Sequence, residues 1–337
     1  MLKCAVAALL LSLGSIVAAA NPQPTWFQTV NNEVQQRVTK ASFSDGIFSV
    51  IGYGNDGTQE FGRANEDTIF EIGSLTKSFT GIIFATLVLE KKLDPEDQVQ
   101  KYIPELANTF AGKIKLSDLA SHKSGLLRVP TNIRNIENPY SEYDWKELLT
   151  FLKSAQFDSG STYSNTGYAL LGRVLSIASG NTFDELVELK IAEPLGMTET
   201  RSVVPGPKSL RFISGYKTGL SPVPHWDWDV FAPTGSLRST IKDLQIFAAA
   251  NLHPEKVSIG PALRLSQQKG WGWDSESLGF PFPYKNGMTG GFASALLILP
   301  DLNLAIIGVS NVAVEVDSII NNVLAEILKN PESRKNQ

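Results

Sequence analysis

Apolar residues near the two ends of the chain follow patterns typical of β-strands. Residues 46–54 predict a strand, and the Asn-Asp-Gly turn at 55–57 predicts a hairpin to residues 59–63. Near the other end, the apolar runs 294–299 and 302–310 flank a Pro-Asp pair and predict a second hairpin. We therefore expect one antiparallel sheet that is built from both ends of the chain.

Other segments carry patterns typical of helices. Residues 79–89 are almost continuously apolar and are followed by two lysines, which predicts a buried helix with cations at its C-terminal end. Apolar residues three and four positions apart predict further helices at 26–40, 144–153, 167–179, 182–189, 241–251 and 317–329.

Together these elements predict an α+β fold of the α/β-sandwich type. Helices flank the antiparallel sheet, and a largely α-helical lobe lies beside it. We expect a signal peptide at 1–20 and a single domain at 21–337, with a sheet lobe at 21–73 and 265–337 and a helical lobe at roughly 74–264. Because binding sites commonly lie between packed lobes, we expect the functional site there.

The first twenty residues predict a cleaved export signal. Lys3 supplies a positive start, an apolar stretch runs from 5 to 17, and three alanines precede Asn21. The alternative is a membrane anchor, but the apolar stretch is short for a helix that spans a bilayer. We therefore expect a periplasmic or secreted protein with no stable membrane anchor, and we expect a monomer.

Composition argues against several classes of protein. The formal net charge is −4 and no basic cluster stands out, so nucleic acid is not an expected partner. The sole cysteine, Cys4, lies in the predicted signal peptide, and the three histidines are scattered. We therefore expect no disulfide, no metal site and no organic cofactor.

A Ser-x-x-Lys motif, Ser74 to Lys77, opens the predicted buried helix. Positions three apart share a helix face, so the ammonium of Lys77 can reach the hydroxyl. Apolar surroundings lower the pKa of a lysine, which can then help to take the proton of the serine. The alternative is an ordinary capped helix with a surface lysine. The preceding glycine and the apolar character of the helix favour a buried Lys77.

A Tyr-x-Asn motif follows at Tyr163 and Asn165. A phenol beside an ammonium has its phenolate favoured and can relay a proton. An asparagine amide can accept a hydrogen bond from a lysine and donate one to a substrate carbonyl. In isolation, a polar helix-capping turn before Gly167 is the favoured interpretation of this motif.

A third, glycine-rich motif contains Lys285, Asn286, Gly287 and Met288, and leads into the strand at 294–299. A strand edge with glycine lets a substrate backbone approach closely and lends N–H groups to an oxyanion. The alternative is a glycine-rich hairpin turn without a catalytic role.

In this order, the three motifs resemble the Ser-x-x-Lys, Tyr-x-Asn and Lys-Thr-Gly motifs of class C β-lactamases, penicillin-binding DD-peptidases and family VIII esterases. The resemblance spans most of the chain after the predicted signal peptide, and it includes blocks at 70–81, 116–130, 195–198, 235–252 and 290–300.

The resemblance implies a β-lactamase/transpeptidase-like fold and a role for each motif residue. Ser74 is implied as the acylated nucleophile, and Lys77 and Tyr163 as a proton-transfer pair in which the proton acceptor stays open. Asn165 is implied to orient the lysine and the substrate amide. Lys285 is implied to hold Tyr163 and a substrate carboxylate electrostatically.

The glycine-rich motif both matches the family and departs from it. By resemblance, the backbone N–H groups of Ser74 and Met288 form an oxyanion hole, in which each donor contributes about 3 kcal/mol. The motif reads Lys-Asn-Gly where the family usually has Lys-Thr-Gly, whose threonine helps to hold a β-lactam carboxylate. Asn286 can donate through its amide instead, with a different size and geometry.

Two more departures concern the substrate. Arg128 lies in the loop where class C β-lactamases place a glutamine that contacts the substrate side-chain amide. It is either a fixed cation that favours an anionic substrate or a solvated loop residue. Residues 312–315 lack the Asn and Arg that class C enzymes use for the carboxylate. These departures weaken the case for efficient cephalosporin hydrolysis.

Aromatic residues gather in two loops. By resemblance, Trp226, Trp228 and Phe231 lie in a loop that edges the cleft, where they can contact an apolar substrate group. For Trp271 and Trp273, packing in the core or between the lobes is the favoured interpretation.

Three functions are compatible with these residues. The leading one is an exported serine hydrolase that forms an acyl-enzyme at Ser74 and acts on β-lactams or related amides and esters, with a small-molecule or peptidoglycan-peptide-like substrate. The alternative is a penicilloyl-binding sensor, or a DD-peptidase or esterase with little β-lactam turnover. A scaffold without chemistry is disfavoured because the Ser, Lys, Tyr, Asn and Lys set is intact.

Overall fold

A computed structural model describes residues 46–51, 58–62, 64–134, 137–157, 163–217, 221–274, 282–313 and 316–329. The predicted signal peptide, the predicted helix at 26–40 and the predicted turn at 55–57 lie outside these residues. Within the described ranges, no helix combines the length and the apolar character needed to cross a membrane.

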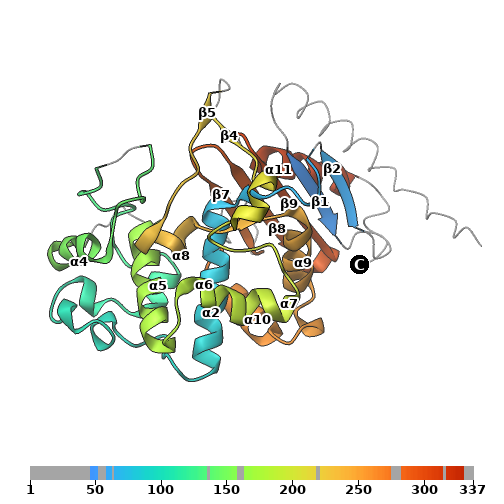
Figure 1. Cartoon of the computed structure of the whole chain (residues 1–337). Coiled ribbons are helices and arrows are strands. Elements are labelled where there is room, and N and C mark those ends of the chain that lie inside the picture. The colour runs from blue at the N-terminus through green and yellow to red at the C-terminus, as the bar shows by residue number, and fades with distance from the viewer. Residues whose placement is uncertain are drawn as a thin grey trace, which may run out of the picture.

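One five-stranded sheet joins the two ends of the chain, and its strand order is β2-β1-β9-β8-β7 (Figure 1). Its strands are β1 (Ile47–Ile51), β2 (Thr58–Gly62), β7 (Tyr284–Met288), β8 (Ala293–Leu299) and β9 (Leu304–Ser310). All four neighbouring pairs are antiparallel. This confirms the predicted sheet, including both predicted hairpin pairings.

Strands β8 and β9 are buried along their whole length, which explains their continuous apolar sequence. Successive side chains of a strand point to opposite faces, so the sheet has two cores. On β8, Leu296 and Ile298 belong to the core shared with the helical lobe. Ala295 and Leu297 belong to a smaller core that is closed by α11 (Val316–Lys329).

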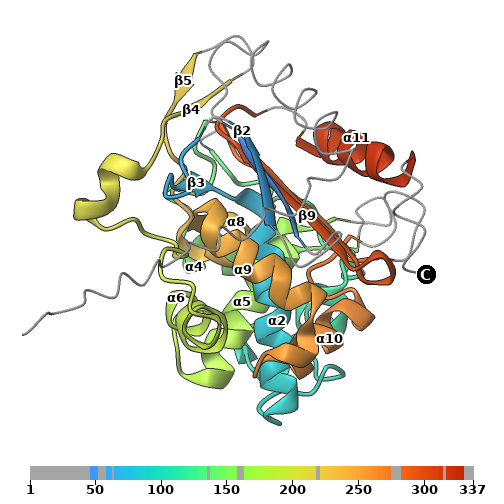
Figure 2. The same ribbon diagram turned by 90° about the vertical axis from the view of Figure 1, so that its right-hand side faces the viewer.

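Helices therefore cover both faces of the sheet (Figure 2). Helix α11 packs on β8 and β9 from one side, and α9 (Ile241–Leu252) packs on β1, β8 and β9 from the other. The sequence analysis placed the residues of α9 in a predicted helical lobe, and in the structure this helix packs against the sheet. Phe247 of α9 stacks on Phe79 of α2 (Thr76–Leu89), with ring centroids 4.1 Å apart.

Helix α2 (Thr76–Leu89) runs through the centre of the molecule, and most of its residues are buried on every side. This confirms the buried helix predicted from the apolar run. The other helices are α3 (Leu116–Ala120), α4 (Trp145–Ser154), α5 (Asn165–Ser179), α6 (Phe183–Val187), α7 (Glu193–Leu195), α8 (Ala232–Gly235) and α10 (Gly260–Lys269).

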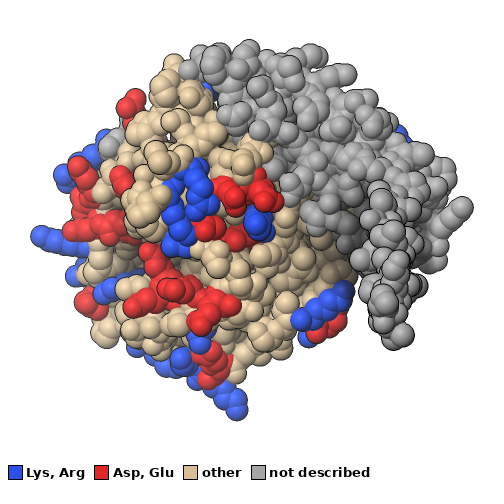
Figure 3. All heavy atoms as spheres, turned by 45° about the vertical axis from the view of Figure 1, so that its right-hand side comes forward, with Lys and Arg blue, Asp and Glu red and all other residues tan. Residues whose placement is uncertain are grey.

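Four two-residue strands pair outside the main sheet. They are β3 (Phe70–Glu71) with β6 (Arg238–Ser239), and β4 (Gly215–Tyr216) with β5 (Pro222–Val223). The first pair ties the segment before α2 to the segment before α9. Basic and acidic side chains are interspersed on the face of the molecule drawn in Figure 3.

Candidate active site

Ser74 lies in a 3-10 turn, Gly73–Leu75, that leads directly into α2. Lys77 follows in the first turn of that helix, and its side chain is completely buried. The ammonium of Lys77 donates to Ser74 Oγ at 3.0 Å and to the carbonyl oxygen of Thr234 at 2.8 Å. The structure thus places Lys77 on the hydroxyl of Ser74, as the motif spacing predicts.

Tyr163 lies between two lysines. Its ring centroid is 4.9 Å from Nζ of Lys77 and 4.7 Å from Nζ of Lys285. Residues from three separate parts of the chain therefore share one small polar space.

Burial and charge shift the proton affinities of this group. Burial lowers the pKa of Lys77 from 10.5 to about 8, because an ammonium loses its hydration there. Burial raises the pKa of Tyr163, but the charges of Lys285 and Lys77 outweigh it and lower that pKa to about 8. The lysine and the phenol can therefore exchange a proton near neutral pH.

Lys285, on β7, is completely buried but paired. Its ammonium donates to Oδ2 of Asp274 at 2.7 Å. Burial lowers the pKa of Lys285, but the charges of Tyr163 and Asp274 and their hydrogen bonds reverse that effect, so the pKa is raised overall. Lys285 thus stays charged in the pH range in which Lys77 loses its proton, and it supplies a fixed cation beside Tyr163.

Strand β7 approaches the Ser74 turn at backbone distance because two glycines leave room for it. A Cβ on Gly287 would lie 2.0 Å from the carbonyl oxygen of Ile72 and 2.8 Å from the amide nitrogen of Leu75. A Cβ on Gly73, whose φ is +50°, would lie 2.6 Å from the amide nitrogen of Met288. The backbone amides at Ser74 and Met288 are therefore neighbours, as an oxyanion hole requires.

Asn165 makes a different contact from the one expected. Its Nδ2 donates to the phenol oxygen of Tyr140 at 2.9 Å. Its Oδ1 is buried and accepts no hydrogen bond from the described residues. The ammonium of Lys77 donates to Ser74 and Thr234 instead, so it is a backbone carbonyl that holds this lysine. The free Oδ1 remains able to accept a hydrogen bond from a substrate N–H group.

A cleft of about 600 Å³ opens over Ser74. The wall of this cleft opposite β7, called the helical wall here, is lined by Arg128, Tyr140, Trp226 and Trp228. The guanidinium carbon of Arg128 lies 4.9 Å from the centroid of the Tyr163 ring. The same wall carries stacked aromatic rings, with Tyr140 and Trp228 centroids 5.0 Å apart. Trp226 and Trp228 line the cleft, as expected. Phe231 does not, because it is buried in the core, as are Trp271 and Trp273.

Asn286 points to the rim of the cleft, on the sheet side. Its Nδ2 donates to Oδ2 of Asp317, in the first turn of α11, at 3.2 Å. Asn286 and Asp317 both line the cleft, together with the half-exposed side chain of Met288. Val314 and Glu315, named above for lacking carboxylate-binding groups, lie outside the described residues.

A family profile described as Beta-lactamase matches residues 23–328, which is most of the chain. The chain belongs to the Beta-lactamase family. It is 28% identical to a beta-lactamase of Psychrobacter immobilis over 74% of its own length and 63% of the relative. It is 24% identical to a beta-lactamase of Escherichia coli (strain K12) over 73% of its own length and 76% of the relative.

It is also 24% identical to the protein named "Protein flp" of Staphylococcus aureus (strain N315), over 79% of the chain and 57% of that relative. The chain spans 63%, 56% and 55% of the length of the first three beta-lactamases that it matches. Membership of the Beta-lactamase family confirms the resemblance drawn from the motifs, and the mixed α and β fold of the chain agrees with it.

Several residues of this Beta-lactamase-family site escaped the sequence analysis. Asp274 belongs to no recognisable motif and simply follows Trp273 in the chain. Thr234 contacts Lys77 through its backbone carbonyl, so its side chain gave no indication of this role. His122 was noted as one scattered histidine, yet its ring stacks on Tyr163 at a centroid distance of 4.3 Å. Burial and the charges of two lysines and an arginine lower the pKa of His122 to about 2, so the imidazole is neutral.

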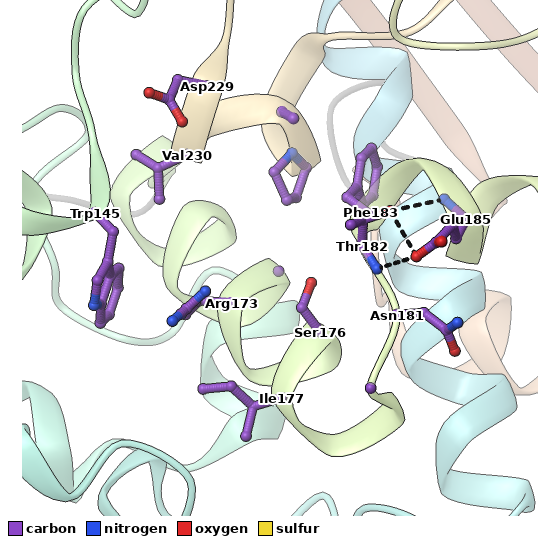
Figure 4. A pocket seen from close by; sticks show the side chains of 14 residues that line it. Trp145, Arg173, Ser176, Ile177, Asn181, Thr182, Phe183, Glu185, Asp229 and Val230 are labelled. Carbon is purple, nitrogen blue, oxygen red and sulfur yellow. Dashed lines mark hydrogen bonds between the residues drawn. The ribbon is translucent and has the colours of Figure 1, made fainter.

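A second hollow of about 600 Å³ lies on the other side of α8, between α5 and α6 (Figure 4). It contains Ser176 and Thr182, but the hydroxyl of Thr182 is used in the N-terminal cap of α6. Among the described residues that line it, no lysine accompanies either hydroxyl. Among the described residues, the Ser-Lys pair therefore lies in the Ser74 cleft and not in this second hollow.

Proposed function

We propose that this protein is an exported serine hydrolase of the class C β-lactamase type, which forms an acyl-enzyme at Ser74. The proposal extends to β-lactams and to related amides and esters as substrates. The observation that carries it is the 3.0 Å contact between Lys77 Nζ and Ser74 Oγ inside the cleft. Because burial lowers the pKa of this lysine to about 8, it can give up a proton at modest cost and then accept one.

In the proposed acylation, Ser74 Oγ attacks the carbonyl carbon of the substrate. The Lys77–Tyr163 pair takes the serine proton and passes it to the leaving group as the bond to that group breaks. Lys285 keeps a positive charge beside Tyr163, which favours the phenolate form. Water then attacks the carbonyl carbon of the acyl-enzyme, and the same pair accepts a proton from the water. The bond between the acyl group and Ser74 Oγ breaks, the pair returns the proton to Oγ, and the acid product leaves.

The remaining roles follow from position. The backbone amides of Ser74 and Met288, kept close by Gly287, stabilise the oxyanion. Oδ1 of Asn165 accepts a hydrogen bond from a substrate amide. Arg128 and the aromatic rings of the helical wall contact the acyl side of the substrate.

The proposal also covers location and organisation. Residues 1–20 are removed as a signal peptide, and the remaining chain acts in the periplasm or outside the cell as one monomeric domain, from 21 to 337, with a small-molecule or peptidoglycan-peptide-like substrate. N-terminal sequencing of the exported protein tests the first part, with Asn21 as the expected first residue.

The activity is tested by combining labelling with turnover. The purified chain is incubated with a fluorescent penicillin, nitrocefin and a p-nitrophenyl ester, in parallel with Ser74→Ala. Turnover that is lost in Ser74→Ala supports the hydrolase. A stable label without turnover favours the penicilloyl-binding sensor, and neither label nor ester cleavage contradicts the catalytic proposal.

A further inference from the structure

Asp317 places a carboxylate on the sheet-side wall of the Ser74 cleft. It lies in the first turn of α11 and accepts hydrogen bonds from the phenol of Tyr284 and from Nδ2 of Asn286. Both donors belong to β7, the strand that also carries Lys285 and Met288. The carboxylate is therefore fixed beside the strand along which a substrate would lie.

Neither partner of Asp317 neutralises its charge. Asn286 is an amide, and burial together with the hydrogen bond to Asp317 raises the pKa of Tyr284, so its phenol stays protonated. In the described part of the chain, Asp317 forms no salt bridge with a lysine, arginine or histidine. The other carboxylate of the cleft, on Asp274, is paired with Lys285. The sheet-side rim thus keeps one uncompensated negative charge.

The amide of Asn286 has two N–H donors, and one of them is used by Asp317. A substrate anion that accepts from the other N–H group would lie close to the carboxylate of Asp317 and would be repelled by it. A neutral group avoids this repulsion, and a cationic group gains an attraction.

The helical wall has the opposite polarity. Arg128 is exposed, and no salt bridge to it is found among the described residues. Its guanidinium lies over the ring of Tyr163. Ser74 therefore lies in a cleft with a fixed cation on one wall and a fixed anion on the other.

We infer that Asp317 determines specificity: it selects substrates that are neutral or cationic where they contact β7, and it discriminates against a carboxylate there. The preferred substrates are uncharged esters and amides, ahead of β-lactams that carry a carboxylate. This inference rests on the proposed acyl transfer at Ser74 and narrows its substrate class.

A matched pair of esters tests the inference. The phenyl and 3-carboxyphenyl esters of N-(phenylacetyl)glycine share one acyl group and differ by one carboxylate on the leaving group. At low salt we expect kcat/KM to favour the neutral ester by about tenfold, a size reasonable for two charges near a protein surface. In Asp317→Asn this preference should fall to near unity.

Asp301→Asn is the matched control, because it removes the same charge from the exposed turn between β8 and β9. Its ratio of the two kcat/KM values should equal that of the wild type. An unchanged ratio in Asp317→Asn, or a wild-type preference for the carboxylate ester, overturns the inference.

Salt gives a second test that needs no variant. Because counterions screen an exposed charge, the wild-type preference should shrink as sodium chloride rises from about 0.05 M to about 1 M. A preference that is independent of salt contradicts a role for the Asp317 charge. Failure to cleave either ester overturns the acyl-transfer proposal as well, whereas cleavage of both esters with an unchanged ratio overturns this inference alone.

Discussion

Two completely buried lysines approach one phenol, and their different partners give them different protonation behaviour. Lys77 donates to Ser74 Oγ and to the carbonyl oxygen of Thr234, and burial lowers its pKa to about 8. Lys285 is paired with Asp274, and its pKa is raised. The charges of Tyr163 and Asp274 therefore keep Lys285 protonated, whereas Lys77 can exchange a proton.

Removing the carboxylate of Asp274 should move the pH dependence of kcat/KM. In the wild type we expect activity to rise as the Lys77–Tyr163 pair loses a proton near pH 8, and to fall when Lys285 deprotonates at higher pH. A carboxylate favours the protonated form of a nearby ammonium, so its loss lowers the pKa of Lys285. In Asp274→Asn the basic limb should therefore move to lower pH.

The conservative change Asp274→Glu keeps the charge and provides the control. It should retain the basic limb of the wild type, even if its rate is lower. A basic limb that stays in place in Asp274→Asn would show that Asp274 does not set the charge of Lys285.

For single residues of the site, the sequence predicted contacts between residues that lie close together in the chain. It missed residues that come to the site from distant parts of the chain. Ser74 and Lys77 share one helical turn, so their contact follows from spacing alone. Asp274 and His122 reach the site from distant loops, and neither belongs to a local motif. Asn165 was predicted to contact Lys77, but the carbonyl of Thr234 occupies that position, and a backbone carbonyl leaves no signal in a sequence.

At the scale of elements, the site depends on how closely β7 lies against the turn that carries Ser74. Gly287 faces the backbone of Ile72 and Leu75, where no side chain fits. Ser294, on β8, donates its hydroxyl to the carbonyl oxygen of Ile72 at 2.7 Å and ties the sheet to the same turn. The position of the oxyanion donors is thus set by packing between a strand and a turn.

The change Gly287→Ala should separate these elements. The added methyl group would lie 2.0 Å from a carbonyl oxygen, so β7 must move away and carry the amide of Met288 with it. We expect kcat to fall by roughly 10²- to 10³-fold, the usual effect of losing one oxyanion donor. Circular dichroism should report a folded protein.

Gly206→Ala is the control for this prediction, because a Cβ there meets no atom within 4 Å. It should keep the wild-type kcat. Full activity in Gly287→Ala would mean that the close approach of β7 is not needed for catalysis.

Long periodic elements were predicted well and short ones were not. The apolar runs of β8, β9 and α2 each extend over enough residues to reveal a period. The pairs β3–β6 and β4–β5 have two residues per strand and reveal none. The helix predicted at 182–189 continues past its predicted end through a π-helical turn, Glu188–Ala192. A π-helical turn has a different period from an α-helix, so the search for α-helical periodicity missed it.

At the scale of the whole molecule, the central helix α2 places the buried ammonium of Lys77 inside the protein core. The fall in the pKa of Lys77 from 10.5 to about 8 corresponds to about 3 kcal/mol of destabilisation when the lysine is protonated. A core that holds such a group gives up stability for reactivity, a trade-off that is common at active sites.

Replacing this lysine should therefore stabilise the fold and abolish the activity. We expect Lys77→Met to raise the free energy of unfolding at pH 7 by about 1 to 2 kcal/mol, since the lost hydrogen bonds offset part of the gain. Because the pKa of Lys77 is lower in the folded state, the penalty is fully present below pH 8 and disappears as the pH rises through 10.5. The gain should shrink over that range in urea unfolding experiments.

Lys123→Met provides a matched control, because this lysine is exposed. Its free energy of unfolding should stay within about 0.5 kcal/mol of the wild type. A Lys77→Met protein that is less stable than the wild type at pH 7 would show that the ammonium stabilises the core.

The most direct test of the central claim is the intact mass of the protein during turnover of p-nitrophenyl acetate. After an acid quench, we predict the added mass of one acetyl group, located on the peptide that contains Ser74. The adduct should be absent from Ser74→Ala and unchanged in Ser176→Ala, which alters a serine in the hollow beyond α8. Turnover without an adduct on Ser74, or an adduct that persists in Ser74→Ala, would contradict the account.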